Sequence, residues 1–375
     1  MTDNIMSDAW VSVSRSALAH NFNAVRALLA LGAGAPPQII AVVKANAFGH
    51  GAGETARVFQ DAGADFFAVT TPAEAMELRA AHIMGRILVF LPPLPEQIRM
   101  LLAADLDLTI GAAADMDAVS EAARTSGRPA SVHLKVDTGM GRLGALPSEA
   151  LELAKRIDKA QELNFAGVYT HFARALEKDE TATRRQFDEF DRVLRGLEHD
   201  GIKPGLRHCA NSAAMVRFPD LRLDAVRPGT ILYGQYPSAA VPRTLDLQET
   251  WRMQARVVAV RDVPAGSAIG YGGEFVTRRP TKIAVLPVGY ADGFSVAPAS
   301  ALAGLRGLKN LLRPAPVTIT VRGKRAPVIG RVAMQICTVD VTDVPGVAVG
   351  DVVTVPARRI MASARLPRLY EDHFI

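Results

Sequence analysis

A lysine directly follows a short apolar run near the start of the chain. Residues 39–43 read Ile-Ile-Ala-Val-Val, and Lys44 comes next, in a segment that ends with His50 and Gly51. An amine at the rim of an apolar interior loses its proton more easily, because burial penalises the charged ammonium form. A neutral lysine amine is a nucleophile that condenses with aldehydes. Lys44 is therefore a candidate catalytic residue, although an isolated rim lysine more often keeps a solvated, charged head.

Lys44 stands at the end of the first of a series of apolar runs. These runs cover residues 39–43, 66–69, 87–91, 106–110, 132–136, 165–169, 206–210 and 225–233. The stretches between them show the helical period of about 3.6 residues, as in residues 180–197, and Thr71-Pro72 with Glu74 is typical of a helix start. Strands that are apolar on both faces, each followed by a helix, favour a closed (β/α)₈ TIM-type barrel over a doubly wound sheet. Reactive side chains of such barrels lie at the carboxyl ends of the strands, where Lys44 is expected.

The rhythm changes after about residue 247. Strand-like pieces follow at residues 256–260, 275–277, 283–288, 317–321, 336–341 and 352–355, separated by Gly and Pro turns. They predict a smaller, mainly antiparallel β domain. The boundary is expected in the proline-bearing stretch Pro237–Asp246, which gives domains of residues 1–246 and 247–375. Residues 297–313 are expected to form a loop with one helical turn.

The composition excludes several classes of protein. The 375 residues carry 43 Lys plus Arg against 38 Asp plus Glu, and 49% of them are hydrophobic, which argues against disorder. No apolar run approaches the ~20 residues that span a bilayer, and the start lacks an apolar signal region. Basic residues are scattered, so an anionic small molecule explains their surplus as well as nucleic acid would. Cys209 and Cys337 cannot form a disulfide framework, which favours a reducing cytoplasm, and the eight histidines lack metal-site spacing.

The segment Val42–Gly51 resembles the lysine segment of the bacterial alanine racemases, which are pyridoxal 5'-phosphate (PLP) enzymes of fold type III. Further segments resemble that family in the same order along the chain. They are Val136–Gly144, Tyr169–Phe172, Asn211–Ala214, Val226–Thr230, Ile269–Gly272, Pro287–Gly293 and Gly330–Met334. The resemblance implies a homodimer that interconverts L- and D-alanine and so supplies D-alanine for peptidoglycan.

The resemblance assigns the two proton-transfer roles to Lys44 and Tyr271. Lys44 would hold the cofactor covalently and act as the base on one face of Cα, and Tyr271 of the partner subunit would serve the other face. Racemisation requires a proton to leave from one side and to arrive from the other. Tyr271 could instead be a half-buried strand aromatic, but Gly270, Gly272 and Gly273 beside it permit a close backbone approach and favour the catalytic role.

Two residues resemble those that control the cofactor ring in the family. Arg227 would donate a hydrogen bond to the pyridine nitrogen, and its permanent charge would keep that nitrogen unprotonated. An unprotonated ring is a weaker electron sink, which favours reprotonation over side reactions. His171 would orient both Arg227 and Tyr271 as a supporting residue rather than as a base.

The resemblance also implies a phosphate site and a substrate site. Ser212 and the backbone N–H groups of Gly229 and Thr230 would bind the phosphate. Ser212 could equally be a simple helix N-cap, a role that is compatible with phosphate binding.

The substrate carboxylate would meet Arg142 and the backbone N–H of Met334 from the partner chain. Lys135, seven residues before Arg142, matches a lysine that is often carbamylated in the family. A carbamate there would turn a cation into an anion that supports Arg142. Tyr290 would line the entrance, or it could be a core aromatic.

Three positions depart from the family pattern. Phe48 stands where a phosphate-binding tyrosine is usual, Gln335 stands where an aspartate is expected, and Ala364 aligns with a second phosphate-binding tyrosine. Each lost phosphate donor weakens cofactor retention by roughly 1–3 kcal/mol unless another group substitutes for it. Without the second tyrosine the pocket beside Cα is wider, and so we expect larger substrates, serine among them, to be accepted.

Two other functions fit the same resemblance in part. A fold-type III PLP amino-acid decarboxylase would usually hold a protonated pyridine nitrogen with a carboxylate, whereas Arg227 occupies that position here. A non-catalytic PLP-binding homeostasis protein would be a short chain with a barrel alone, and the β domain that carries Tyr271 argues against it.

Overall fold

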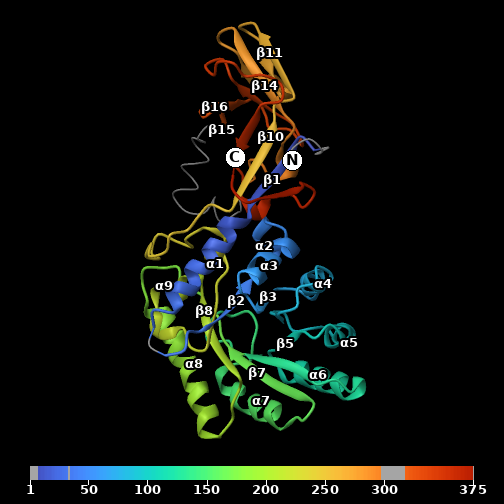
Figure 1. Cartoon of the computed structure of the whole chain (residues 1–375), viewed down its shortest axis with the longest axis vertical. Coiled ribbons are helices and arrows are strands. Elements are labelled where there is room, and N and C mark those ends of the chain that lie inside the picture. Colours follow the sequence, from blue (N-terminus) through green and yellow to red (C-terminus); the bar gives the residue numbers. More distant parts are fainter. Residues whose placement is uncertain (1–6, 33, 297–316, 375) are drawn as a thin grey trace. The chain divides into compact units, whose positions relative to one another are not determined.

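The computed structural model describes residues 7–32, 34–296 and 317–374 of the chain. It divides into two compact units, of which the first is Arg15–Thr250 and the second joins the chain up to Ser14 with the chain from Trp251 onward. Figure 1 labels the elements of both units. The predicted loop at residues 297–313 lies outside the described residues. Among the residues that are described, no helix has the length and the apolar character needed to cross a membrane.

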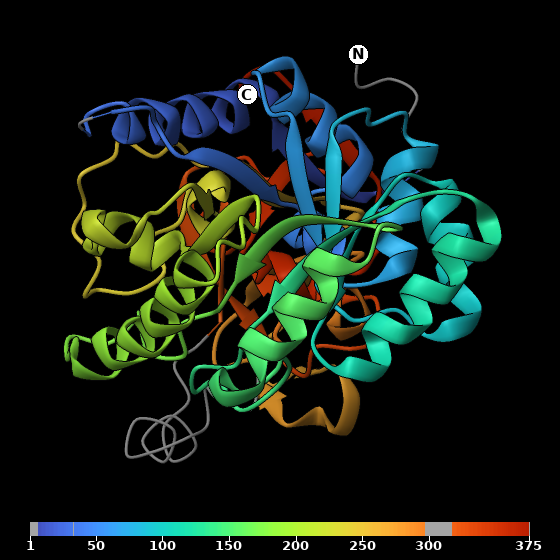
Figure 2. The same cartoon turned by 90° about the horizontal axis from the view of Figure 1, so that it is seen from below.

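The first unit is a closed barrel of parallel strands, as predicted. Within the described residues its strands are β2 (Gln38–Val42), β3 (Phe66–Val69), β4 (Arg86–Val89), β5 (Asp107–Ile110), β6 (Ala130–Lys135), β7 (Leu163–Tyr169), β8 (Leu206–Asn211) and β9 (Ala225–Arg227). Strand β9 closes the barrel by pairing with β2, where Ile39 lies opposite Val226. In Figure 2 the helices of this unit surround its strands.

The helices of the barrel unit alternate with its strands along the chain, and α1 precedes the first of them, β2. They are α1 (Arg15–Leu29), α2 (Lys44–Gly49), α3 (Ala52–Asp61), α4 (Pro72–Ala80), α5 (Pro95–Ala103), α6 (Ala113–Ser126), α7 (Pro147–Lys159), α8 (Thr181–His199) and α9 (Ser212–Arg217). The predicted start of α4 is confirmed, because Glu74 N donates to Thr71 Oγ1 and Thr71 N donates to Glu74 Oε2. Such a reciprocal pair satisfies backbone donors that the first helical turn leaves without partners.

The second unit is built on an antiparallel sheet. In the part of the chain that is described, the order of its nine strands is β11-β14-β17-β16-β15-β18-β10-β1-β19. Their bounds are β1 (Ala9–Ser14), β10 (Trp251–Arg256), β11 (Ala259–Val263), β14 (Thr281–Leu286), β15 (Thr318–Val321), β16 (Lys324–Ile329), β17 (Cys337–Asp340), β18 (Val352–Val355) and β19 (Arg368–Glu371). A short hairpin of β12 (Ala268–Ile269) and β13 (Phe275–Val276) accompanies the sheet. Among the described strands of this sheet, β1 and β19 form the one parallel pair.

The structure differs from the predicted elements at several places. The strand predicted at residues 256–260 spans the break between β10 and β11, and β1, β16 and β19 were not predicted. The strand predicted at residues 225–233 ends at Arg227, because Pro228 follows and has no N–H for the ladder, and a 3₁₀ turn occupies Thr230–Tyr233. The units divide after Thr250 rather than after Asp246, and β1 joins the second unit.

Candidate active site

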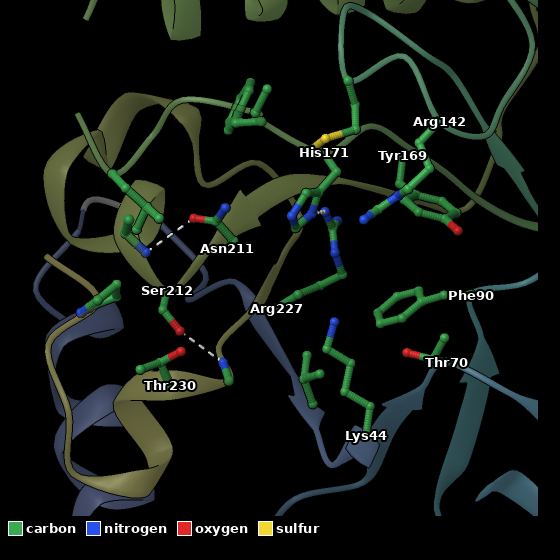
Figure 3. A pocket seen from close by; sticks show the side chains of 18 of the residues that line it. Lys44, Thr70, Phe90, Arg142, Tyr169, His171, Asn211, Ser212, Arg227 and Thr230 are labelled. Atoms are coloured by element: carbon green, nitrogen blue, oxygen red, sulfur yellow. Dashed lines mark hydrogen bonds between the residues drawn. The ribbon is translucent and has the colours of Figure 1, made fainter. Parts of the chain in front are cut away.

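A cavity of about 780 Å³ lies in the barrel unit and is lined by residues that follow its strands. Every candidate residue that the sequence places in this unit lines the cavity, namely Lys44, Lys135, Arg142, His171, Ser212, Arg227, Gly229 and Thr230. They converge because the carboxyl ends of parallel barrel strands meet at one face. In Figure 3 the amine of Lys44 and the guanidinium groups of Arg142 and Arg227 point into the same space.

Lys44 leads into a turn of left-handed backbone. Residues Ala45–Phe48 have φ between 51° and 54°, although none of them is glycine. Left-handed helical backbone costs roughly 1–2 kcal/mol for each residue with a Cβ atom, so surrounding contacts must hold the turn. Glu74 Oε1 accepts a hydrogen bond from Ala45 N at 2.6 Å, and Asn46 Oδ1 accepts one from Ala52 N at 2.8 Å. The sequence carries no sign of this turn.

A buried histidine supports the same turn. His50 Nδ1 lies 2.9 Å from the carbonyl oxygen of Ala47, and its Nε2 lies 2.8 Å from Oγ1 of Thr250. Tyr233 packs its ring 4.7 Å from that of Phe48 and donates its hydroxyl to the carbonyl of Val42 at 3.0 Å. The backbone on both sides of Lys44 is therefore fixed by side chains from the far end of the barrel sequence.

Positive charges concentrate around the cavity and act on one another. Burial, and then the charge of Arg142, lower the pKa of Lys44, and Glu74 opposes this shift. Burial, followed by the charges of Arg227 and Arg142, lowers the pKa of Lys135 to about 7. Both amines are therefore easier to deprotonate than an ordinary lysine, which is the requirement for a nucleophile or a base.

The loop that carries Arg142 is wrapped around a carboxylate. Asp137 Oδ1 accepts hydrogen bonds from the backbone N–H groups of Gly139, Met140 and Gly141, and its Oδ2 accepts one from Arg142 N at 3.0 Å. Burial works against ionisation, but these backbone donors prevail and lower the pKa of Asp137. Asp137 thus holds the loop in place while Arg142 remains exposed.

Arg227 is buried and its guanidinium is held by several acceptors. Nη1 donates to His208 Nδ1 at 2.6 Å and to the His208 carbonyl at 2.9 Å, and Nη2 donates to the Thr170 carbonyl at 2.6 Å. Nη2 also lies 3.4 Å from His171 Nδ1, the expected partner. Burial lowers the pKa of Arg227 to about 10, so it remains charged at neutral pH. His208 was missed by the sequence prediction, where it stands inside the apolar run at residues 206–210.

His171 is suited to accept a hydrogen bond rather than to carry a charge. Burial, and then the charges of Arg227 and Lys135, hold the pKa of His171 well below its ordinary value. The neutral ring can therefore offer Nδ1 as an acceptor to Arg227. The carbonyl of His171 accepts a hydrogen bond from Gln186 Nε2 at 3.3 Å, which fixes the loop after β7.

Ser212 begins helix α9 but does not cap it. Asn211 is the N-cap, and its Oδ1 accepts hydrogen bonds from the N–H groups of Ala213 and Ala214 at 3.1 and 3.0 Å. The alternative role of Ser212 as an N-cap is therefore wrong. Ser212 Oγ instead accepts the N–H of Gly229 at 2.8 Å, as the dashed line in Figure 3 shows. The oxygen accepts, so the hydroxyl proton of Ser212 can point into the cavity.

The remaining candidates lie in the second unit. Tyr271 is 72% exposed, Tyr290 is 50% exposed and Met334 is 58% exposed, so neither tyrosine is the core or half-buried aromatic considered as an alternative. Tyr290 and Met334 lie on adjacent strips of backbone, because Ala291 N donates to the Met334 carbonyl at 3.0 Å. This approach requires Gly289, where a Cβ atom would lie 2.1 Å from the carbonyl oxygen of Ala333.

Comparisons with known proteins agree over most of the chain. Residues 13–237 match the family described as alanine racemase, N-terminal domain, and residues 250–366 match alanine racemase, C-terminal domain. The alanine racemase of Methanococcus maripaludis is 37% identical over 385 residues, which cover 96% of this chain and 98% of the relative. That of Desulforamulus reducens is 41% identical over 360 residues, with 96% and 91% covered.

A solved structure matches this chain across the residues of both units. The alanine racemase of Clostridium difficile 630 superposes with a TM-score of 0.90 at 29% sequence identity, and the match covers 98% of this chain and 97% of that one. The chain belongs to the alanine racemase family, and it is an isomerase that acts on an amino acid.

Proposed function

We propose that the chain is a PLP-dependent racemase that interconverts L- and D-alanine by a two-base exchange of the proton on Cα. The observation that carries this proposal is the convergence of the Lys44 amine with Arg142 and Arg227 in one cavity. The product D-alanine would serve peptidoglycan synthesis in the cytoplasm, and the enzyme would work as a homodimer with shared active sites.

The groups that line the cavity fit PLP chemically. PLP is an anionic aldehyde, and the cavity offers a lysine amine of lowered pKa together with the buried guanidinium of Arg227. The hydroxyls of Ser212 and Thr230 lie along another wall, as expected for a phosphate site. When it is bound, PLP supplies an aldehyde to the lysine and a ring that draws electron density from Cα.

The residues of this chain would divide the remaining work. Arg142 would bind the substrate carboxylate together with the N–H of Met334, and so fix the orientation of Cα. Lys44 would take or return the proton on one face, which its lowered pKa favours. Arg227 would keep its proton and donate a hydrogen bond to the ring nitrogen, so that the ring remains a weak electron sink and reprotonation is favoured.

Tyr271 would serve the opposite face of Cα from the partner subunit. Its exposed position in a 3₁₀ turn, Tyr271–Gly273, supports a role toward a group outside its own unit. Tyr290, also exposed, would line the entrance to the same site. Because the proposed site needs two chains, the Tyr271 side chain is expected to be exposed in a single chain.

Lys135 is proposed to be carbamylated. With a pKa of about 7 a large share of its amine is neutral at physiological pH, and the neutral amine is the form that adds to carbon dioxide. The carbamate would place a negative charge among the cations that now repel one another, and so would position Arg142.

Serine is proposed as a second substrate. Phe48 lines the cavity and lacks the hydroxyl of the family tyrosine, and Ala364 is a small, exposed residue where the family has a larger one. If the resemblance to the family holds at these two positions, both replacements would remove bulk from the substrate site. Turnover of L-alanine at least a hundredfold faster than of L-serine would count against this extension, with a ratio of about tenfold or less expected.

One experiment tests the proposed function. Purified protein should show a near-visible absorbance band of bound PLP that is lost on borohydride treatment and in Lys44→Ala. Chiral chromatography should then detect D-alanine formed from L-alanine by the wild-type protein and not by the variant. A protein that binds PLP but releases carbon dioxide from alanine would be a decarboxylase instead, and one that binds PLP without turnover would be a homeostasis protein.

A further inference from the structure

A chain of polar side chains crosses the interior of the barrel behind Arg227. Arg227 Nη1 donates to His208 Nδ1 at 2.6 Å, and His208 Nε2 lies 3.1 Å from His133 Nδ1. His133 Nε2 lies 3.1 Å from Asp107 Oδ2, which also accepts from Arg86 Nη2 at 2.5 Å. Asp107 and Arg86 are the first residues of β5 and β4, whereas Arg227 is the last residue of β9. This row of hydrogen-bonded side chains therefore connects the end of the barrel where β4 and β5 begin with the end where β9 stops.

These groups are buried where an apolar core would be expected. His133 and His208 are fully buried, and Asp107 is 5% exposed. Each buried polar group costs roughly 1–3 kcal/mol if its hydrogen bonds are missing, so a continuous set is expected to be kept for a reason. Strand β7 even leaves room for one ring, because a Cβ atom at Gly167 would lie 2.4 Å from His133 Nδ1.

In the row of side chains from Arg227 to Asp107, the groups at the two ends determine the direction of every hydrogen bond. A guanidinium can only donate, so His208 Nδ1 must accept from Arg227, and the proton of a neutral His208 ring must stand on Nε2. Nε2–H then donates to His133 Nδ1, which leaves the His133 proton on Nε2, facing the carboxylate of Asp107. Arg86 Nη2 lies 3.4 Å from the same nitrogen, and both donors converge on Asp107 Oδ2.

Neighbouring groups hold the rings in these orientations. The ring of Tyr169 stacks on His208 with 4.9 Å between centroids and 5° between planes. Thr109 Oγ1 donates to the Val89 carbonyl at 2.7 Å, so the Tyr169 hydroxyl donates to Thr109 at 2.9 Å and cannot turn away. Burial, and then the charge of Arg227, lower the pKa of His208. Burial also lowers the pKa of His133, although the hydrogen bond to Asp107 opposes this shift, so both rings are kept neutral.

We propose that Asp107, His133 and His208 are positioning residues that fix the orientation of Arg227 and relay the negative charge of Asp107 to it through two imidazole dipoles. The relay lets a buried arginine stay charged without a carboxylate beside it. A carboxylate in contact with Arg227 would compete with the pyridine nitrogen for its N–H groups, and Asp107 stabilises the charge from a distance instead. This role rests on the proposed binding of PLP at Arg227.

The tautomers are testable without any variant or cofactor. Histidine labelled with ¹⁵N in protein freed of PLP should give two rings with the proton on Nε2 and an unprotonated Nδ1 from pH 6 to 8. A coupling between nitrogens across the N–H···N hydrogen bond identifies the pair as His208 and His133. A proton on Nδ1 of either ring, or an imidazolium signal at pH 7, would overturn the relay.

Variants test the effect on the cofactor. Asp107→Asn keeps an oxygen for the His133 proton and removes the charge, and it should raise the PLP dissociation constant by about tenfold. Asp224→Asn is the matched control, since Asp224 also pairs with an arginine of a barrel strand, Arg207, at 2.7 Å. None of the described contacts of Asp224 involves a histidine. Asp224→Asn should leave PLP binding within about twofold, even where both variants lose stability.

The outcomes separate the relay from the function on which it rests. Wild-type protein that binds no PLP would refute the proposed function, and the NMR result would still decide the relay. Wild-type protein that binds PLP, with Asp107→Asn no weaker than Asp224→Asn, would refute the relay and leave the function intact. A loss of thermal stability alone, without a change in PLP affinity, would mark Asp107 as structural and also refute the proposal.

Discussion

The side-chain amine of Lys135 lies 4.6 Å from the centre of the Tyr169 ring, and the two residues are register partners at the ends of β6 and β7. Burial raises the pKa of Tyr169 to about 12, so the phenol is neutral and adds no negative charge. The Lys135 ammonium therefore lies near the face of the Tyr169 ring and is repelled by the charges of two arginines. Asp137 opposes the effect of these charges on the pKa of Lys135. The charged form of this lysine is a cost to the folded state.

We predict that stability rises with pH because of Lys135. The folded-state pKa of Lys135, about 7, lies below the ordinary value of 10.5. Between these two pH values the unfolded chain binds more protons than the folded chain, so the free energy of unfolding increases as the pH rises. In buffer free of carbon dioxide, Lys135→Met should flatten this slope and increase the free energy of unfolding at pH 7 by about 2–4 kcal/mol. Chemical denaturation at pH 7, 8 and 9 measures both effects.

The matched control for this prediction is Lys155→Met. Lys155 is a surface lysine that pairs with Asp200 at 2.9 Å, and its removal should leave the slope of stability between pH 7 and 9 as it is in the wild type. Parallel slopes for all three proteins would show that Lys135 does not titrate in this range.

We predict that Asn46 stabilises the left-handed turn after Lys44. Asn46→Ala removes the acceptor of the Ala52 N–H and places a residue that disfavours positive φ, so it should cost about 1–2 kcal/mol of stability and lower turnover. Asn46→Gly keeps the backbone freedom and should cost less. Asn164→Ala, which removes an exposed contact with Ser131, is the control and should be near neutral. Denaturation midpoints that do not differ between Asn46→Ala and Asn164→Ala would contradict the role of Asn46.

We predict that Lys44→Ala and Tyr271→Phe complement each other. If each site takes its lysine from one chain and its tyrosine from the partner, a mixed dimer contains one intact site. Unfolding and refolding an equal mixture should therefore restore about a quarter of wild-type activity. Each variant alone should be nearly inactive, and Lys44→Ala mixed equally with wild-type protein gives the reference, which should keep about half of the wild-type activity. Activity no higher than that of the unmixed variants would mean that both residues of a site belong to one chain.

We predict that Phe48→Tyr and Ala364→Tyr separate cofactor binding from substrate choice. Phe48 lines the cavity, and a hydroxyl there should strengthen PLP retention by about 1–2 kcal/mol, read as a lower dissociation constant. Ala364→Tyr should reduce turnover of serine more than that of alanine, because it fills the space proposed for the larger side chain. An unchanged ratio of serine to alanine turnover in Ala364→Tyr would remove the structural basis for serine as a substrate.

The barrel and the convergence of its site residues are predictable from the sequence, because both depend on local patterns. Each apolar run marks a strand, and the carboxyl ends of parallel strands meet whatever the helices between them. Lys44 is expected at that face for this reason, whereas Arg227 and Ser212 are assigned to the same site by their resemblance to the alanine racemase family. The second unit is less predictable, since the partners in its sheet are far apart in sequence, as with Ala9 opposite Ala255.

The supporting residues were missed for a different reason. His133 and His208 stand in apolar runs, and only the three-dimensional register of the barrel brings them together across 75 residues. Helix propensity does not predict the left-handed turn after Lys44, because Ala45 and Ala47 ordinarily favour a right-handed helix. The resemblance to the family points to the groups that are expected to touch a substrate, whereas the groups behind them depend on tertiary contacts.

Strand β1 lies in the sheet between β10 and β19, so the barrel sequence is inserted within the sequence of the β unit. During translation β1 leaves the ribosome before its sheet partner β10, which is synthesised more than 200 residues later. At ordinary elongation rates this delay is roughly 10–50 s. In that interval the apolar face of β1 has no sheet to join, while the barrel can already close. Newly made chains are therefore expected to expose the apolar side chains of β1, and chaperone capture should concentrate there until β10 and the later strands of the sheet have emerged.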